Sequence, residues 1–172
     1  MTLVECTAAH VVEIRDIFNE AILNSTALYD DQPRTLAIVE KWFSAKKEAG
    51  YPVLGILSDE GILAGFASYG PFRTLPAYKY TVEHSVYVHS EYRGRGVGAR
   101  LLFGLIEAAR GDNYHMMIGG IDSANTASLR LHERLGFTHC GHVREAGFKF
   151  GRWLDLDFYQ LLLSGPENPG AG

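Results

Sequence analysis

The sequence predicts an α+β fold in which helices flank a mixed central β-sheet. Runs rich in β-branched residues alternate along the chain with segments whose apolar residues recur every three or four positions, as in strands and helices. The early strands are joined by short turns, which is typical of antiparallel pairing, whereas a helix separates the later ones and implies a parallel crossover. We expect one domain over residues 1–163, followed by a flexible Pro/Gly-rich tail over residues 164–172.

The first third of the chain predicts a strand, two helices and a hairpin. Thr7 and Thr35 stand directly before two apolar periodicities, where an N-cap residue is expected, and Gly50 ends the second helix. The run Asp59-Glu60-Gly61 is a hairpin turn between two apolar segments. The strands expected in this part of the chain cover residues 2–6, 53–57 and 62–69.

The rest of the chain predicts strands and helices in alternation. The β-branched and aromatic stretch at 81–89 runs into a glycine-rich turn, and apolar residues at helical spacing follow from Ala99. The elements expected after this helix are a strand at 116–121, a helix at 125–135, and a final pair of strands at 138–143 and 156–163 with Gly147, Gly151 and Trp153 in their connection.

Composition and charge exclude several classes of function. The formal net charge is −4 and no block of Lys and Arg stands out, so we expect no nucleic-acid partner. No apolar run approaches the roughly 18 residues of a membrane span, and the N-terminus does not resemble a signal peptide, so we expect a cytoplasmic protein without a membrane partner. Cys6 and Cys140 are too few for a disulfide framework, and the histidines show no spacing that suggests a metal site.

The turn Arg93-Gly-Arg-Gly-Val-Gly98 is the first candidate binding site. A glycine turn that opens a helix presents free backbone N–H groups and the positive end of the helix dipole, and the two arginines add charge. We therefore expect it to bind a phosphate or a pyrophosphate. It lacks the Gly-Lys-Ser/Thr of a P-loop. Residues 94–99 do match the dinucleotide-binding pattern, although that pattern usually lies at the start of a βαβ fold and has no flanking arginines. A tight strand–helix turn that binds no ligand is a further alternative.

A second candidate site lies on the helix expected at 125–135. Asn125, Ser128 and His132 are spaced i, i+3 and i+7, so one helix face carries three polar groups; an ordinary solvated face is the alternative. The glycine turn also fits the pattern Arg/Gln-x-x-Gly-x-Gly/Ala. In this order the two motifs resemble those of the GNAT superfamily of acyl-CoA-dependent N-acyltransferases.

The resemblance implies acetyl-CoA as co-substrate, bound by the strand, the turn and this helix. The residues expected to contact it are Val86, Tyr87, Val88, Arg93, Gly94, Arg95, Gly96, Val97, Gly98, Ala99, Asn125 and Ser128. At the place of His132 the family usually has a tyrosine that protonates the departing thiolate. A histidine serves there as the acid only if its environment keeps the imidazole protonated.

Acyl transfer to an amine requires a base for the amine, a hydrogen-bond donor for the oxyanion and stabilisation of the thiolate. Glu83 is the candidate base because it lies at the start of the strand, upstream of the backbone that should receive the thioester, although a solvent-facing strand-end carboxylate is common. His84 follows it and should point to the opposite face as a structural residue. Backbone N–H groups within residues 86–88 are the candidate oxyanion donors.

Three segments resemble one branch of the superfamily more closely, the phosphinothricin / methionine sulfoximine acetyltransferases. They are Ser68-Tyr-Gly-Pro-Phe-Arg73, residues 78–88 and residues 147–155. The resemblance implies an amino-acid acceptor with a phosphinyl, sulfoximine or sulfone group, and a homodimer whose acceptor site lies near the subunit interface. Arg73 offers a planar fork for carboxylate or phosphinate oxygens, although a surface position is the commoner fate of a loop arginine. The residues expected to bind the acceptor are Tyr29, Asp30, Phe72, Arg73, Thr74, Tyr80, Thr81, Val82 and Glu83.

We therefore expect an acetyl-CoA-dependent N-acetyltransferase that acts by direct transfer on the α-amino group of such amino acids. Two alternatives stay open. The acceptor is a peptide N-terminus or another amine, or the protein is a non-catalytic sensor that binds acyl-CoA.

Overall fold

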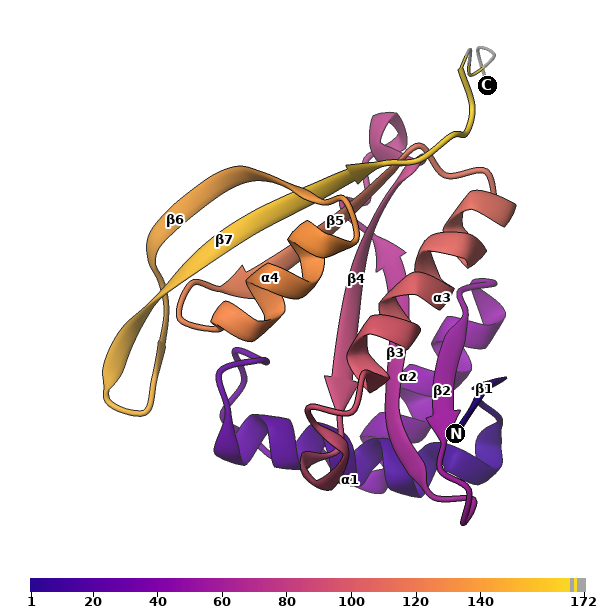
Figure 1. The fold of residues 1–172 in the computed structure, drawn as a ribbon, viewed down its shortest axis with the longest axis vertical. Helices are drawn as coiled ribbons and strands as arrows, with labels where there is room; N and C mark the ends of the chain where they lie inside the picture. Colours follow the sequence, from indigo (N-terminus) through magenta and orange to yellow (C-terminus); the bar gives the residue numbers. More distant parts are fainter. Residues whose placement is uncertain (168, 170–172) are drawn as a thin grey trace.

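One mixed sheet with helices on both faces organises the chain (Figure 1). The computed structural model describes residues 1–167 and 169, so residues 168 and 170–172 of the expected tail lie outside the described residues. The described strands form a seven-stranded sheet in the order β1-β2-β3-β4-β5-β7-β6. The strands are β1 (Thr2–Glu5), β2 (Val53–Leu57), β3 (Leu63–Pro71), β4 (Thr81–Val88), β5 (Met116–Asp122), β6 (Thr138–Lys149) and β7 (Arg152–Leu162). The α-helices are α1 (Val11–Asn24), α2 (Leu36–Glu48), α3 (Val97–Gly111) and α4 (Thr126–Arg134).

The pairing of the strands confirms the predicted mixed sheet. All neighbouring strands are antiparallel except β4 and β5, which are parallel and are connected through α3. The parallel pair is short, because only Thr81–Glu83 of β4 pair with residues 116–118 of β5. Beyond Glu83 the two strands separate, as Figure 1 shows. The remaining edge of β4 therefore faces an opening in the middle of the sheet.

The helices bury two apolar cores, one on each face of the sheet. On one face, α1 and α2 pack on β-strand residues that include Phe66 and Tyr87. On the other face, α3 packs on residues that include Tyr69 and Met117. Thr35 caps α2 as expected, since its hydroxyl accepts a hydrogen bond from the Ile38 amide at 3.3 Å. Within the part of the chain that the structure describes, no helix is both long and apolar enough to cross a lipid bilayer.

The last two strands differ most from the sequence prediction. They form a long hairpin with its turn at Phe150 and Gly151, and the strands cover residues 138–149 and 152–162. The prediction that Gly147 and Trp153 lie in the connection is wrong. Gly147 lies within β6, where a Cβ atom would stand 2.7 Å from the Tyr29 ring. This glycine allows close packing rather than a turn.

Candidate functional site

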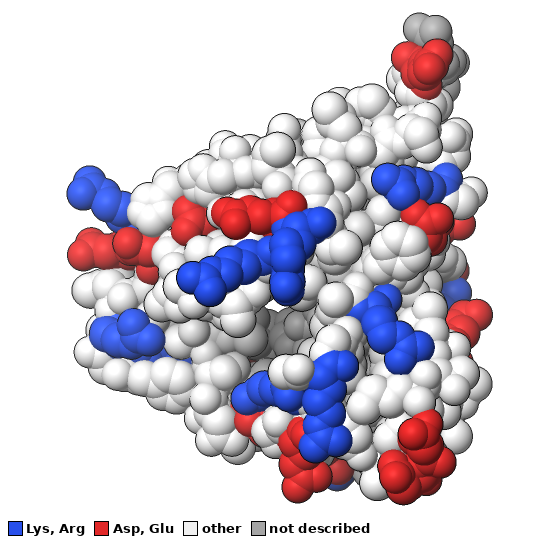
Figure 2. Space-filling model, viewed as in Figure 1, with Lys and Arg blue, Asp and Glu red and all other residues white. Residues whose placement is uncertain are grey.

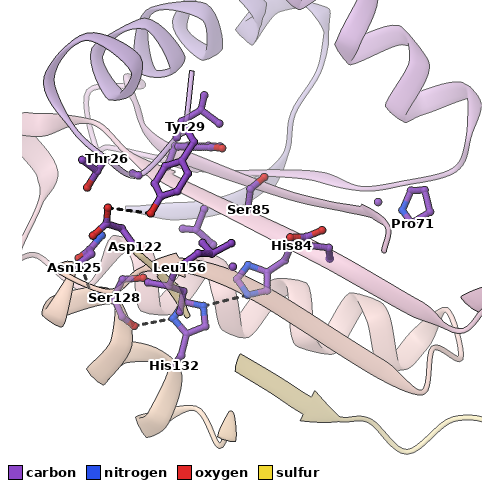
Figure 3. A pocket seen from close by; sticks show the side chains of 18 of the residues that line it. Thr26, Tyr29, Pro71, His84, Ser85, Asp122, Asn125, Ser128, His132 and Leu156 are labelled. Carbon is purple, nitrogen blue, oxygen red and sulfur yellow. Dashed lines mark hydrogen bonds between the residues drawn. The ribbon is translucent and has the colours of Figure 1, made fainter. Parts of the chain in front are cut away.

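A cavity of about 510 Å³ lies where β4 and β5 separate (Figure 3). Its wall comes from the loop after α1, from α2, from strands β3, β4, β5 and β7, and from α4 and the loop before it. The lining residues are Thr26, Ala27, Leu28, Tyr29, Lys46, Gly70, Pro71, Glu83, His84, Ser85, Val86, Tyr87, Gly120, Ile121, Asp122, Asn125, Ser128, His132 and Leu156.

The cavity passes through the sheet from one face to the other. Successive side chains of a strand point to opposite faces. Glu83, like Tyr87, therefore lies on the face of α1 and α2, whereas His84 lies on the face of α3 and α4, as predicted. All three line the cavity because β4 has no partner on its β5 side beyond Glu83. A molecule that enters from one face thus meets a molecule that enters from the other.

Glu83 lines this opening with its carboxylate close to β5. Its strand neighbour on β3 is Gly70, and a Cβ atom on Gly120 of β5 would lie 3.5 Å from its Oε1 atom. Partial burial raises the pKa of the Glu83 carboxyl above 4.5, and the Arg73 guanidinium counteracts part of that rise. A raised pKa makes the carboxylate a stronger base than an exposed glutamate.

Two backbone amides of β4 point into the opening. The His89 amide donates to the Ala64 carbonyl of β3 at 3.0 Å. Because the N–H groups of an extended strand alternate in direction, the Tyr87 amide also points to β3, and the amides of Val86 and Val88 point the other way. The opening therefore receives two N–H groups within residues 86–88, and the Tyr87 amide is not one of them.

His132 and His84 form a buried stacked pair on the wall of the cavity. Their rings lie 5.0 Å apart at an angle of 17°, and their Nε2 atoms are 3.1 Å apart. The His132 Nδ1–H donates to the Ser128 carbonyl at 2.7 Å, since a carbonyl can only accept. In the neutral pair the His132 Nε2 then accepts from the His84 Nε2–H, which leaves the buried His84 Nδ1 without a partner among the described residues.

The environment of this pair favours its neutral form. Burial lowers the pKa of His132, against a smaller opposite effect of the Ser128 carbonyl. Burial, followed by the charge of a protonated His132, lowers the pKa of His84 to about 3. The lowered pKa of His132 thus opposes the protonated imidazole that a role as the acid requires.

The three polar residues predicted on one face of α4 do meet at the cavity. Asn125 is the N-cap of α4, and its Oδ1 accepts from the Ser128 amide at 3.1 Å. The Ser128 carbonyl in turn orients His132. The predicted spacing is thus correct, and part of the polar capacity of these residues serves the helix itself.

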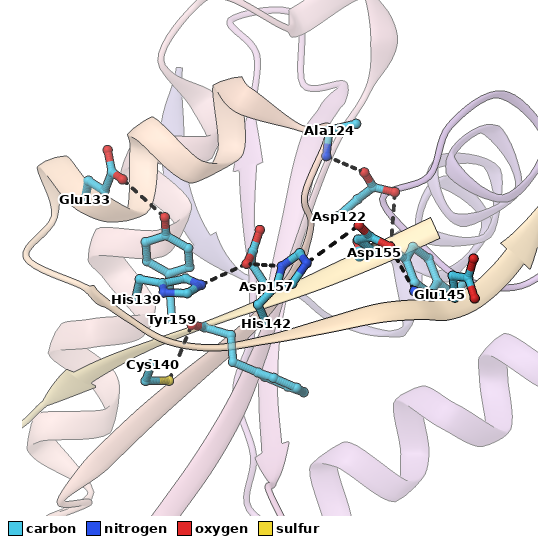
Figure 4. Close-up of polar contacts among 12 residues, drawn as sticks. Asp122, Ala124, Glu133, His139, Cys140, His142, Glu145, Asp155, Asp157 and Tyr159 are labelled. Atoms are coloured by element: carbon cyan, nitrogen blue, oxygen red, sulfur yellow. Dashed lines mark hydrogen bonds and ion pairs between the residues drawn. The ribbon is translucent and has the colours of Figure 1, made fainter. Parts of the chain in front are cut away.

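Hydrogen bonds that the sequence did not reveal hold the loop after α1 in place at the cavity. The Tyr29 hydroxyl shares its one hydrogen between the Asp155 carbonyl oxygen, 2.9 Å away, and Asp122 Oδ2, 3.2 Å away, and Figure 3 shows the contact with Asp122. Asp122 also accepts from the Ala124 amide at 2.7 Å (Figure 4), which orders the start of α4. Lys149 of β6 donates to the carbonyls of Ser25 and Leu28 of this loop, at 2.7 and 2.9 Å.

The predicted phosphate turn lies outside the lining of this cavity, at the N-terminus of α3. Gly94 and Gly96 adopt left-handed φ angles of 74° and 78°, and the first intrahelical bond runs from the Arg100 amide to the Gly96 carbonyl at 3.1 Å. The amides of residues 97–99 thus have no partner within the helix. Arg93 is tethered to the Glu20 carboxylate and donates to the Val88 carbonyl at 3.3 Å. Figure 2 shows basic side chains on both sides of a hollow on this face of the molecule.

Several residues predicted to bind the acceptor lie away from the cavity wall. Val82 is a correction, because its side chain is 1% exposed in the core on the α3 face. Asp30 lines a smaller cavity with Tyr29 and Lys149. The others are not among the lining residues and lie in the chain just after Pro71 or just before Glu83: Phe72, Arg73, Thr74, Tyr80 and Thr81. The Arg73 guanidinium is exposed and stacks 4.2 Å from the centroid of the Phe72 ring.

Lys46 and Asp122 are cavity residues that sequence reasoning missed. Lys46 belongs to an ordinary amphipathic helix, and nothing in the local pattern separates it from Lys47. Asp122 follows a strand directly and stands three residues before the polar face of α4, which was a usable signal. Among the described residues, no group of three or more His, Cys, Asp or Glu is arranged to hold a metal ion.

Comparison with known proteins gives a consistent picture. A family model described as Acetyltransferase (GNAT) family matches residues 12–137. The L-methionine sulfoximine/L-methionine sulfone acetyltransferase of Pseudomonas paraeruginosa is 47% identical to this chain, over 86% of each protein. A solved acetyltransferase structure from Salmonella typhimurium with its cofactor acetyl-CoA is 42% identical, with a TM-score of 0.96 over 100% of this chain and 99% of that chain. A phosphinothricin acetyltransferase from Sinorhizobium meliloti in complex with acetyl-CoA is 36% identical, with a TM-score of 0.94 over 98% and 91% of the two chains.

Proposed function

Since this chain belongs to the GNAT acetyltransferase family, we propose that it transfers the acetyl group of acetyl-CoA to the α-amino group of a small amino acid. The acceptors proposed are L-methionine sulfone, L-methionine sulfoximine and phosphinothricin, which the names of its relatives contain. The observation that carries this proposal is the opening between β4 and β5. It brings the Glu83 carboxylate from one face of the sheet close to free backbone amides that the other face can reach.

We assign the cofactor to the α3–α4 side of the opening. The free amides of residues 97–99, together with Arg93 and Arg95, supply positive potential for the pyrophosphate at the start of α3. Gly98 of α3 faces α4, since a Cβ there would meet Leu131 at 3.5 Å, an ordinary contact. Asn125 and Ser128 line the cavity between this end and Glu83. The basic side chains around the hollow in Figure 2 suit a polyanionic ligand.

The residues of β4 would perform direct transfer. Acetyl-CoA, when bound, supplies the thioester carbonyl that the amine attacks. Glu83 takes the proton of the acceptor ammonium, directly or through a water, so that a lone pair becomes available for attack. The amides of Val86 and Val88 lie about 6.6 Å apart along the strand, so one of them donates to the carbonyl oxygen as negative charge develops on it. They are fixed by the sheet and need no rearrangement.

His132 would line the site from which the thiolate departs, without donating a proton to it. Burial lowers its pKa, and its Nδ1–H is already engaged with the Ser128 carbonyl. A thiol has a pKa of about 8.5, so a thiolate leaves without full protonation. An ammonium that becomes an amide loses two protons: Glu83 takes one before attack, and the nitrogen releases the second as the thiolate leaves. One of these protons ends on the thiolate and the other in bulk water.

We also propose that the chain works as a homodimer. The strand β6 is an edge of the sheet, and the hairpin β6–β7 carries Phe148, Phe150 and Trp153 with more than half of each surface exposed. An apolar edge of this kind favours association. The same hairpin contacts the loop after α1 through Lys149, so a partner that covers it would lie near the acceptor side of the cavity. Sedimentation velocity tests the assembly.

A thiol-release screen tests the proposed activity. The purified protein is mixed with acetyl-CoA and a panel of amino acids, their sulfone and sulfoximine derivatives, a tripeptide and several simple amines. We expect turnover with the sulfone and sulfoximine amino acids and N-acetylated products by mass spectrometry. Turnover confined to the peptide or to simple amines would contradict the acceptor assignment. Tight acetyl-CoA binding without turnover on any amine would instead indicate a sensor.

A further inference from the structure

A single lysine charge lies inside the cavity on the acceptor side. Lys46 of α2 lies among the lining residues, which include the carboxylates of Glu83 and Asp122 but no other Lys or Arg. Its ammonium donates to the Tyr69 carbonyl at 2.8 Å. Within the described part of the chain, no carboxylate lies at ion-pairing distance from it. Burial lowers the pKa of Lys46, which reflects the unfavourable solvation of its charge there.

The packing around Lys46 positions its charge for a ligand. The aromatic rings of Trp42 and Tyr51 lie with centroids 5.9 and 5.4 Å from its Nζ atom. These contacts compensate part of the lost hydration, but they supply no negative charge. Since an ammonium has three donors, the hydrogen bond to the Tyr69 carbonyl leaves two for other groups. An anion in the cavity would satisfy both the charge and these donors.

The register of β3 and β4 places this charge beside Glu83. A Cβ atom on Gly70 would lie 2.9 Å from the Lys46 Nζ, so the ammonium occupies the space of the missing side chain. Gly70 is directly opposite Glu83 in the antiparallel pair. Cβ positions of facing residues lie roughly 4.5–5.5 Å apart. The Lys46 ammonium therefore lies over the β3 residue that faces Glu83, on the same face of the sheet as the Glu83 side chain.

We propose that Lys46 binds the α-carboxylate of the amino-acid acceptor while Glu83 faces its α-amino group. This inference rests on the proposed function and adds to it the group that recognises the carboxylate. In an α-amino acid the ammonium and the carboxylate are bonded to the same α-carbon. A site that binds both groups therefore needs an anionic and a cationic side chain near each other. Arg73, at the exposed entrance, is left for the polar tail of the acceptor.

The test compares one acceptor with and without its carboxylate charge. Steady-state thiol release is measured for L-methionine sulfone and for its α-carboxamide, with the unsubstituted enzyme and with Lys46→Gln. Gln removes the charge and retains a donor for the Tyr69 carbonyl. We expect the ratio of kcat/KM for acid over amide to fall by about tenfold to a hundredfold in Lys46→Gln, chiefly through the KM of the acid. Lys46→Arg should restore most of the ratio.

Each ratio is measured on one enzyme preparation, so it does not depend on the fraction of folded protein. Lys47→Gln is the matched control, because Lys47 is the next residue of α2, is 40% exposed and pairs with Glu5. It should leave the ratio unchanged. Equal losses for acid and amide in Lys46→Gln, an unchanged ratio, or an unsubstituted enzyme that accepts both equally would overturn the assignment of Lys46. An unsubstituted enzyme that acetylates no amino acid would instead refute the proposed function.

Discussion

Adding one methyl group at Gly119 should disrupt the histidine pair and destabilise the protein. A Cβ atom on Gly119 of β5 would lie 2.6 Å from the Nε2 of His84 and 3.2 Å from the Nε2 of His132. Both rings are buried, and Phe137 packs edge-on against them with centroids at 5.6 and 5.1 Å. Because both rings also line the cavity, they can give way only toward it, which would break the stacked pair.

The expected cost follows from overpacking. Inserting a methyl group into a well-packed core costs about 1–3 kcal/mol. For a chain of this size, that corresponds to a fall in Tm of roughly 2–12 °C. Because His132 lines the cavity, kcat should fall as well. Thermal unfolding followed by circular dichroism and steady-state thiol release measure the two effects.

Gly141→Ala is the matched control for Gly119→Ala. Gly141 also lies in a strand at an ordinary φ angle, but its Cβ would meet Phe158 at 3.9 Å, an ordinary contact. We expect its Tm to change by less than about 2 °C. If Gly119→Ala unfolds at the same temperature as Gly141→Ala and keeps its kcat, the close packing of the histidine pair on β5 is refuted.

Two further predictions concern the cofactor turn and the pH dependence. Gly96→Val should weaken acetyl-CoA binding by about tenfold to a hundredfold in calorimetry, because a β-branched residue disfavours the φ of 78° that directs the amides. Gly61→Val, with a φ of 82° and equally open space, should strain the fold similarly and leave the affinity unchanged; equal affinities in both variants would remove the turn from the cofactor site. Lowering the pH should reduce kcat through the pKa of Glu83, which burial raises above 4.5, because only the ionised carboxylate accepts a proton. The pKa of His132 is lowered from 6.5, so we expect no loss of kcat as the pH rises from about 7 to about 8; such a loss would indicate an imidazolium acid.

Local sequence rules sufficed for the centre of the fold. A β-branched run, a glycine turn and an apolar periodicity depend on neighbouring residues alone, and they correctly gave β4, the turn at residues 93–98 and α3. The i, i+3, i+7 spacing of Asn125, Ser128 and His132 likewise brought these residues to one cavity. The long hairpin was not predictable in this way. A glycine is needed at position 147 because the Tyr29 ring, which is distant in the sequence, packs against it, and not because the chain turns there.

The rest of the site depends on contacts across the chain. His84 and His132 are 48 positions apart, and their rings meet over Gly119 of β5, which lies beyond the short pairing of β4 with β5. Lys46 is indistinguishable from a surface lysine until β3 places Gly70 beneath its ammonium. Neither the separation of two strands nor the register of a third is encoded in a local pattern.

Glu83→Gln tests the proposed chemistry most directly. The change retains the size of the side chain and removes its basicity. With acetyl-CoA and L-methionine sulfone at neutral pH, kcat should fall by about 10²-fold or more, while the affinity for acetyl-CoA in calorimetry stays the same. Glu107→Gln on the exposed surface of α3 is the control and should keep its kcat. The rate of Glu83→Gln should recover partly as the pH rises and free amine accumulates. A near-normal kcat for Glu83→Gln at neutral pH would contradict the assignment of Glu83 as the base.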